Sequence, residues 1–353
     1  RTFSGTSWNG TPWGLFGSQG DGVISLTLLA YDNLSNLYQT TGYQWVLNTT
    51  RALATISVSG THVNSYLPAS GTTIYINPPS GWHVAVVMNW SIERAGNIVF
   101  ANGSSNNATI SQSLDDMTDG RLWVNVTTTD AYGRVVNQSR LFTIDGNITG
   151  LPVLSISGTS VTINASLYVA VDAAISLANL SDDATGVGFS HAQCKETSSS
   201  TWIRTTGTSF ALTSTPSQEV YFEIECRLVD LLGNTGTSVI INGTIDAIKP
   251  SVSVTPTGNP KVALETYLLV NLGDSQGLGT SVLRFQWQNG SASSTRELNF
   301  SGANWNSSIQ NIFGSIGDGN ITLGIDAYDA LGNLRQSAGH SWVLNTTLPL
   351  SNV

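Results

Sequence analysis

Alternating apolar and polar residues mark four segments of the chain, each 11 or 12 residues long. The segments are GVISLTLLAYD (22–32), GRLWVNVTTTD (120–130), EVYFEIECRLVD (219–230) and GNITLGIDAYD (319–329). Alternation with a period of two, rich in β-branched and aromatic residues, is typical of a strand with one buried face. The side chains expected on that face are Leu26, Leu28, Val124, Val126, Ile224, Cys226, Leu323 and Ile325.

A turn follows each segment, and an Asp begins it. The turns read DNLSN, DAYGR, DLLGN and DALGN, and their first residues are Asp32, Asp130, Asp230 and Asp329. An Asp carboxylate accepts hydrogen bonds from nearby main-chain N–H groups and so initiates a type I turn. A second apolar strand comes after each turn, so the sequence predicts a closing hairpin in each unit.

These hairpins recur with a period close to 100 residues. Successive turn acids are separated by 98, 100 and 99 residues, and such a period indicates a repeat architecture. The first and last copies also align without gaps at an offset of 297 residues, which pairs Asp21 with Asp318. The first copy contains only the end of a unit, so we expect residues 1–50 to be half a domain.

No segment has a convincing helical pattern, so we expect an all-β fold. Short strands, frequent turns and a unit of about 99 residues favour tandem immunoglobulin-like (Ig-like) β-sandwich domains, arranged as beads on a string in a rod. The predicted division is a partial domain at 1–50, then domains at 51–149, 150–249 and 250–347, with 348–353 as the start of a next repeat or a linker strand. Two explanations of the half-domain stay open. The chain is a segment of a longer repeat array, or a neighbouring subunit supplies the missing strands.

A large residue recurs about 40 residues before the turn acid of each complete unit, at Trp90, Cys194 and Trp287. In an Ig-like sandwich, a central strand carries a large buried residue that faces the penultimate strand. Cys226 lies on that penultimate strand, four residues before Asp230. We therefore predict a disulfide between Cys194 and Cys226. The alternative is a pair of free buried thiols in a reducing compartment.

The composition favours an extracellular protein. Charged residues make up only 10% of the chain and the net charge is −9, which argues against a nucleic-acid partner. No apolar run approaches the ~20 residues of a membrane-spanning helix. The 17 N-x-S/T sequons exceed the roughly seven expected by chance and predict N-glycosylation. The candidate sites are Asn9, Asn33, Asn48, Asn89, Asn102, Asn107, Asn125, Asn137, Asn147, Asn164, Asn179, Asn242, Asn289, Asn299, Asn306, Asn320 and Asn345.

The closing patterns YDALGN…WVLNTTLP and VDLLGN…GTIDAIKP resemble tandem Ig-like repeats of bacterial and archaeal cell-surface proteins. In that family a final hairpin carries an Asp-x-x-Gly-Asn turn and ends in an Asp-x-x-x-Pro linker. Asp246 and Pro250 fit the linker pattern, whereas Asn48 and Asn345 stand at the equivalent Asp. The resemblance implies a stalk, adhesin rod, surface-layer component or appendage, and the sequon-rich linker looks archaeal.

Residues for catalysis are sparse. The histidines His62, His83, His191 and His340 occupy unrelated positions of their units, and no catalytic triad, carboxylate pair, phosphate loop or CxxC motif is evident. We therefore expect no enzyme and no catalytic residue.

Calcium binding by the repeated acids is an alternative, because calcium requires clustered oxygen ligands. The densest local group is Asp115, Asp116 and Asp119. The recurring turn acids are explained more simply as turn formers, so we expect no cofactor and no metal site.

These observations predict a structural role. We expect a glycosylated extracellular repeat array that builds a cell-surface filament, stalk or surface layer. Its partners would be further copies of itself or continuing repeats, head to tail, together with covalent N-glycans. The alternative is an adhesin or carbohydrate-binding surface protein, in which Trp8 and Trp305, expected between strands, stack on sugars instead of packing at a domain junction.

Overall fold

The computed structural model describes residues 7–18, 20–80, 85–205, 207–213 and 218–347. His83 and the segment 348–353, for which the sequence analysis makes predictions, lie outside these ranges. Contacts divide the chain into two compact units. Unit 1 comprises Arg1–Asn147, Ala184–Val187 and Asp230–Asn234, and unit 2 comprises Ile148–Asp183, Gly188–Val229 and Thr235–Val353.

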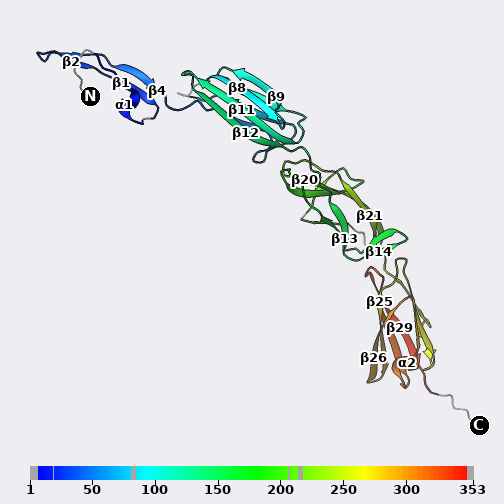
Figure 1. The fold of residues 1–353 in the computed structure, drawn as a ribbon. Helices are drawn as coiled ribbons and strands as arrows, with labels where there is room; N and C mark the ends of the chain where they lie inside the picture. Colours follow the sequence, from blue (N-terminus) through cyan, green and yellow to red (C-terminus); the bar gives the residue numbers. More distant parts are fainter. Residues whose placement is uncertain (1–6, 19, 81–84, 206, 214–217, 348–353) are drawn as a thin grey trace, which may run out of the picture. The chain divides into compact units, whose positions relative to one another are not determined.

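The regular secondary structure of the described chain is almost all β-strand, and the strands pair into sheets (Figure 1). This confirms the all-β prediction. Two single-turn helices, α1 (Pro12–Phe16) and α2 (Ile309–Phe313), depart from it. Each begins at a hydroxyl residue, Thr11 or Ser308, whose side chain accepts a main-chain hydrogen bond from the first turn. So short a helix leaves little periodicity for sequence reasoning to detect.

Residues 55–144 of unit 1 form a two-layer sandwich. One sheet has the order β10-β7-β5 and the other β6-β12-β11-β8-β9. The strands are β5 (Thr55–Ser59), β6 (Tyr66–Leu67), β7 (Thr72–Asn77), β8 (Ala85–Arg94), β9 (Ile98–Ser105), β10 (Ile110–Leu114), β11 (Gly120–Asp130) and β12 (Val135–Ile144). The core between the sheets includes Val124 and Val126, as their alternation predicts, together with Phe142.

Residues 153–246 repeat this arrangement, with sheets ordered β13-β16-β19 and β14-β15-β21-β20-β17-β18. The strands are β13 (Val153–Ser157), β14 (Ser160–Ile163), β15 (Ser166–Val169), β16 (Ala174–Ala178), β17 (Phe189–Glu196), β18 (Ile203–Arg204), β19 (Ser209–Ala211), β20 (Glu219–Asp230) and β21 (Val239–Asp246). Cys194 on β17 and Cys226 on β20 form a disulfide within the core. This is the pairing that the sequence predicts.

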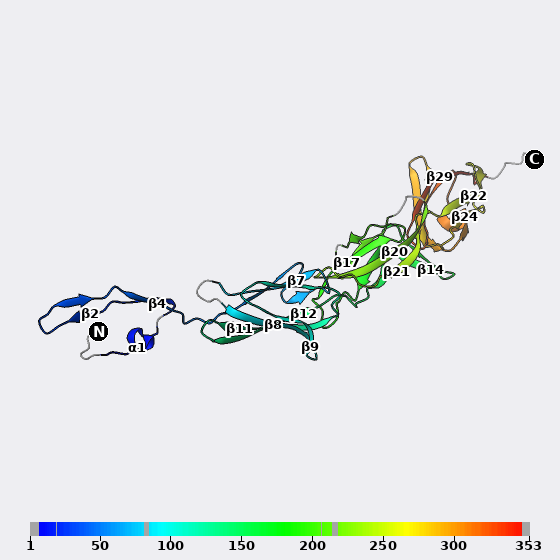
Figure 2. The same cartoon turned by 90° about the horizontal axis from the view of Figure 1, so that it is seen from above.

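Residues 251–344 of unit 2 form a third sandwich, with sheets ordered β22-β24-β27 and β23-β29-β28-β25-β26 (Figure 2). The strands are β22 (Ser251–Thr255), β23 (Lys261–Val262), β24 (Tyr267–Gly273), β25 (Thr280–Asn289), β26 (Ala292–Ser301), β27 (Asn304–Ser308), β28 (Gly319–Tyr328) and β29 (Leu334–Leu344). Leu323 and Ile325 of β28 face the core with Trp342. The domain boundaries near residues 50, 150 and 250 stay a prediction.

The first copy of the hairpin is exposed. Its strands are β1 (Gly22–Leu26), β2 (Leu29–Tyr31), β3 (Leu37–Gln39) and β4 (Tyr43–Leu47), and the pairs are β1 with β4 and β2 with β3. Trp45 is 52% exposed, whereas its counterpart Trp342 is 1% exposed. Leu26 is 41% exposed, against 1% for Leu323. The same residues therefore form a core only where a second sheet covers them.

The large residue of the central strand is less buried than expected. Trp90 and Trp287 point toward their cores but remain partly exposed, and only Cys194 is fully buried. The fully buried aromatic residues of these sheets are Phe142 on β12, Trp342 on β29 and Phe285 on β25. Phe142 and Trp342 belong to the closing strand of the hairpin, whereas Phe285 lies on the same central strand as Trp287.

Candidate functional site

The turn acids have one conserved geometry within the chain. One carboxylate oxygen of each accepts main-chain N–H groups from the residues two and four positions later. The other oxygen accepts a bond from the side chain four positions later. The four pairs are Asp32 with Asn36, Asp130 with Arg134, Asp230 with Asn234, and Asp329 with Asn333. The interpretation of these acids as turn formers is confirmed.

The residue at the fourth position has a second contact, which the sequence analysis missed. In unit 2, the Asn333 amide donates to the main-chain oxygen of Asp246, with a distance of 3.0 Å from Nδ2. In unit 1, the Asn234 amide donates to the main-chain oxygen of Asp145 at 2.9 Å. Each acceptor lies at or next to the end of the closing strand of the preceding repeat. The turn therefore holds the segment that enters its own repeat.

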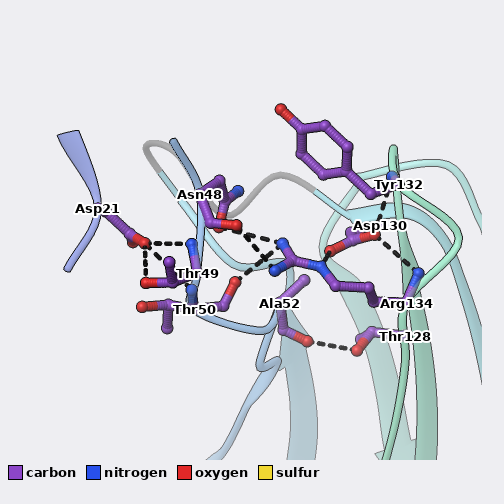
Figure 3. A network of polar contacts seen from close by, with 9 residues as sticks. All are labelled: Asp21, Asn48, Thr49, Thr50, Ala52, Thr128, Asp130, Tyr132 and Arg134. Carbon is purple, nitrogen blue, oxygen red and sulfur yellow. Dashed lines mark hydrogen bonds and ion pairs between the residues drawn. The ribbon is translucent and has the colours of Figure 1, made fainter. Parts of the chain in front are cut away.

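Arg134 makes the corresponding contact earlier in unit 1 (Figure 3). Its guanidinium donates to the main-chain and side-chain oxygens of Asn48 at 2.9 and 3.1 Å, and to the Thr50 carbonyl at 3.0 Å. Its Nε lies 2.6 Å from Asp130 Oδ2. Burial would raise the pKa of Asp130, but the hydrogen bonds from Arg134 outweigh this and lower it. A cation thus neutralises the buried turn acid.

In three of the four hairpins, the first acid bonds to the segment that leaves the hairpin. Asp21 accepts the main-chain N–H groups of Thr49 and Thr50, and Asp318 accepts that of Thr346. Asp119 accepts the N–H of Gly146 and the side-chain amide of Asn147. The pKa of Asp21 is lowered, chiefly by the Thr49 N–H. In these three hairpins, an acid therefore fixes the start of the segment that leaves the hairpin.

A group of acids in unit 2 stands out chemically. Asp246 ends β21, Asp274 follows β24, and Asp329 begins the turn after β28. One carboxylate oxygen from each lies within 4.8 Å of the other two. Asp246 and Asp329 are buried, with exposed fractions of 0% and 2%, and Asp274 is half-buried. Three separate strands therefore bring three carboxylates to one point.

Burial and the charges of neighbouring acids raise the pKa values of Asp246 and Asp274. The pKa of Asp246 is raised first by burial and then by the charges of Asp274, Asp329 and Glu219, against a lowering by the Ile248 N–H. The pKa of Asp274 is raised by burial and by Asp329 and Glu219. Among the described residues, no Lys, Arg or His forms an ion pair with these acids.

One oxygen of this group is unsatisfied. Asp246 Oδ1 accepts the Ile248 N–H at 2.8 Å. Asp246 Oδ2 is buried and has no hydrogen-bond partner. Burying a carboxylate oxygen without a hydrogen-bond partner costs free energy. Such an oxygen therefore marks a position where a bound ligand could supply the missing contact.

The acids singled out from the sequence as the densest local group do not assemble. Asp119 bonds to Gly146 and Asn147, and the three-acid groupings found in the described part of the chain include none of Asp115, Asp116 and Asp119. Proximity in sequence therefore does not bring these acids together, whereas Asp246, Asp274 and Asp329 converge from distant segments. No local sequence signal identifies that convergence.

The aromatic candidates differ from each other. Trp305 lies within β27 and not between strands, and its ring packs 5.4 Å from the Phe285 ring beside the core. Trp8 lies outside any strand and is 44% exposed. Trp305 therefore serves packing.

The candidate glycosylation sites lie at the surface. Asn48 and Asn125 are half-buried, and the other sequon asparagines are exposed. None of the helices in the described ranges has the length and apolar character that crossing a bilayer requires.

Comparison with known proteins gives structural similarity only. No family model matches the chain, and no curated protein matches it in sequence. The chain is similar to a structure of a 1.5-MDa bacterial ice-binding adhesin (13% identity, 85% of this chain and 100% of that one, TM-score 0.38). It is also similar to a tetra-tandem repeat in the extending region of a large adhesion protein (16% identity, 94% and 83%, TM-score 0.29). A third similar structure is that of the fibronectin(III)-like modules of Clostridium thermocellum CbhA (11% identity, 55% of this chain and 94% of that one, TM-score 0.29). The tandem Ig-like architecture rests on the strand orders themselves, which repeat in each sandwich.

Proposed function

We propose that this chain is a structural component of the cell surface, a glycosylated array of Ig-like repeats that builds a filament, stalk or surface layer. The proposed role is non-enzymatic. The observation that supports it is the recurring contact between a turn and the segment that enters the same repeat. Asn333 holds the main-chain oxygen of Asp246, and Arg134 holds that of Asn48. A contact that recurs from repeat to repeat suits a tandem array, in which each repeat is stabilised by its neighbours.

The surface chemistry supports an extracellular location. The charged fraction of 10% is low for a soluble protein, and the sequon asparagines other than Asn48 and Asn125 are exposed, as N-glycan attachment requires. Such glycans would replace charge as the source of solubility. Further copies of the chain, or continuing repeats, are the partners that we propose for head-to-tail assembly.

The first experiment measures the mass of the native polypeptide before and after chemical deglycosylation. We expect a clear loss of mass and glycopeptides at exposed sequons such as Asn137 and Asn242, with lower occupancy at half-buried Asn125. An unchanged mass would overturn the glycoprotein assignment.

A second experiment places the protein on the cell. Antibodies against residues 51–149 are applied to intact source cells, and bound antibody is located by immunogold electron microscopy. A continuous filament or layer with regularly spaced label supports the structural role. Label confined to scattered single stalks, together with binding of the purified chain to glycans, would favour the adhesin instead.

A further inference from the structure

The unsatisfied oxygen of Asp246 is the starting point. Its side chain is fully buried, its Oδ2 lacks any hydrogen bond, and carboxylate oxygens of Asp274 and Asp329 lie within 4.8 Å. Three carboxylates at this separation repel one another strongly in a site that water does not reach freely. Such a group is stable when protonated or when a cation lies among the oxygens.

The donors select the kind of cation. All three are carboxylate oxygens, and no Cys or His belongs to the group. Hard divalent ions prefer such ligands, and calcium accepts six to eight oxygens in a flexible geometry that carboxylates and water can complete together. Magnesium requires a near-ideal octahedron with shorter bonds, which carboxylates on three separate strands suit less well.

The repeat containing β5–β12 provides an internal comparison. At the position of Asp246 it has Asn48, and after the strand that corresponds to β24 it has Pro78 in place of Asp274. Only the turn acid Asp130 remains, and the guanidinium of Arg134 pairs with it at 2.6 Å. Where the acids are lost, the protein thus supplies its own cation. Where they are present, the position of Arg134 is occupied by Asn333, which is neutral.

We propose that Asp246, Asp274 and Asp329 bind a calcium ion in unit 2. The ion would take the unsatisfied Oδ2 of Asp246 as one ligand, and Glu219 would add negative charge nearby. It would tie the end of β21 to the loop after β24 and to the turn after β28. The sequence alone favoured turn formation over calcium binding for the repeated acids and led to the expectation of no metal site, which this proposal replaces for unit 2. In sequence, the same acids recur at Asp145, Asp182 and Asp230.

Isothermal titration of the full chain, freed of metal with EDTA, tests the proposal. The variants are Asp246→Asn and Asp274→Asn, and the matched control is Asp318→Asn, an exposed acid of the same repeat that Thr346 and Thr347 already bond. We expect the wild-type chain to bind calcium more tightly than magnesium. Each test variant loses one equivalent of bound calcium, and the control loses none.

Thermal unfolding provides the second readout, which separates a ligand from a purely structural acid. In EDTA, Asp246→Asn should be at least as stable as wild type, because it removes an uncompensated buried charge. With calcium, only wild type and the control gain stability, by mass action. Equal numbers of calcium equivalents in wild type and both test variants would overturn the proposal, as would destabilisation of Asp246→Asn in EDTA and calcium alike. Equal affinity for magnesium would overturn the assignment to calcium.

Discussion

The guanidinium of Arg134 donates a hydrogen bond to the main-chain oxygen of Asn48 across 2.9 Å. A neutral amide makes the same contact in a later repeat, where Asn333 donates to Asp246 at 3.0 Å. The residue four positions after the turn acid therefore completes the turn and bonds to the segment that enters the repeat, and it is charged in one repeat and neutral in another. The charge of this residue follows the number of acids around it. Arg134 lies beside one acid, Asp130, whereas Asn333 lies beside a group of three.

Replacing Arg134 with Ala should destabilise its repeat. The Asp130 side chain is 2% exposed, and the substitution leaves its charge buried and unpaired. Breaking a buried pair by removing one partner costs about 3–5 kcal/mol, and the lower end applies here because Arg134 is partly exposed. Hydrogen exchange of peptides from residues 55–144 measures the effect. Arg121→Ala, an exposed change on β11, should alter exchange by less than about 0.5 kcal/mol. Similar effects for both variants would contradict the prediction.

The pair Trp342 and Trp45 provides a matched test of burial. Trp342→Ala removes a side chain that is 1% exposed and bonded through Nε1 to the Pro256 carbonyl, and it should cost about 3–5 kcal/mol in the repeat that contains β29. Trp45→Ala removes a side chain that is 52% exposed, and it should cost less than about 1 kcal/mol. Urea unfolding of the two variants, followed by hydrogen exchange, compares them. A large loss on Trp45→Ala would show that another chain or segment covers the first hairpin.

Removing the disulfide should loosen a single repeat. Cys194 and Cys226 are both fully buried and are separated by 32 residues in sequence. The double substitution to Ala should cost roughly 2–4 kcal/mol, because the unfolded chain loses a constraint and the core loses two sulfur atoms. Peptides from residues 153–246 should exchange faster, while those from 55–144 should not change. Faster exchange in both regions would mean that the repeats do not unfold independently.

Asp318 should make stability depend on pH. Hydrogen bonds from Thr346, first from its N–H and then from its hydroxyl, hold the pKa of the Asp318 carboxyl below its ordinary value. A carboxyl with a lowered folded-state pKa contributes stability that is present above its unfolded-state pKa and is lost as the pH falls through the folded-state pKa. We therefore expect Asp318→Asn to lower the thermal midpoint at neutral pH and to have progressively less effect as the solution is acidified. A difference independent of pH would show that the acid contributes only as a hydrogen-bond acceptor.

The first hairpin should be the most accessible part of the described chain. Its apolar side chains Leu26, Tyr31 and Trp45 are 41%, 65% and 52% exposed, and the core clusters of the described residues include none of them. A region with few buried contacts opens at low free-energy cost. Limited chymotrypsin digestion should therefore cleave within residues 20–50 before it cleaves any of the three sandwiches. First cleavage at Trp342 or Phe142 would contradict this.

Sequence reasoning predicted much of this fold because the chain repeats local rules. Alternation identified the buried faces of β11, β20 and β28, and spacing paired Cys194 with Cys226. It overestimated the burial of Trp90 and Trp287, which stay partly exposed although Ile92 and Phe285, two positions away on the same faces, are buried. Alternation tells which face of a strand a residue occupies, and burial depends also on what covers that position.

The sequence by itself determined the all-β class, the hairpins and their turn acids, because these follow from neighbouring residues: a period of two and an Asp that bonds its own turn. Only the tertiary structure decided that Leu26 is exposed while Leu323 is buried, since a second sheet covers one and not the other. It alone also brought Asp246 to Asp274 and Asp329. These acids lie at the ends of separate strands far apart in the chain, and their meeting depends on strand pairing and sheet packing, which no local pattern encodes.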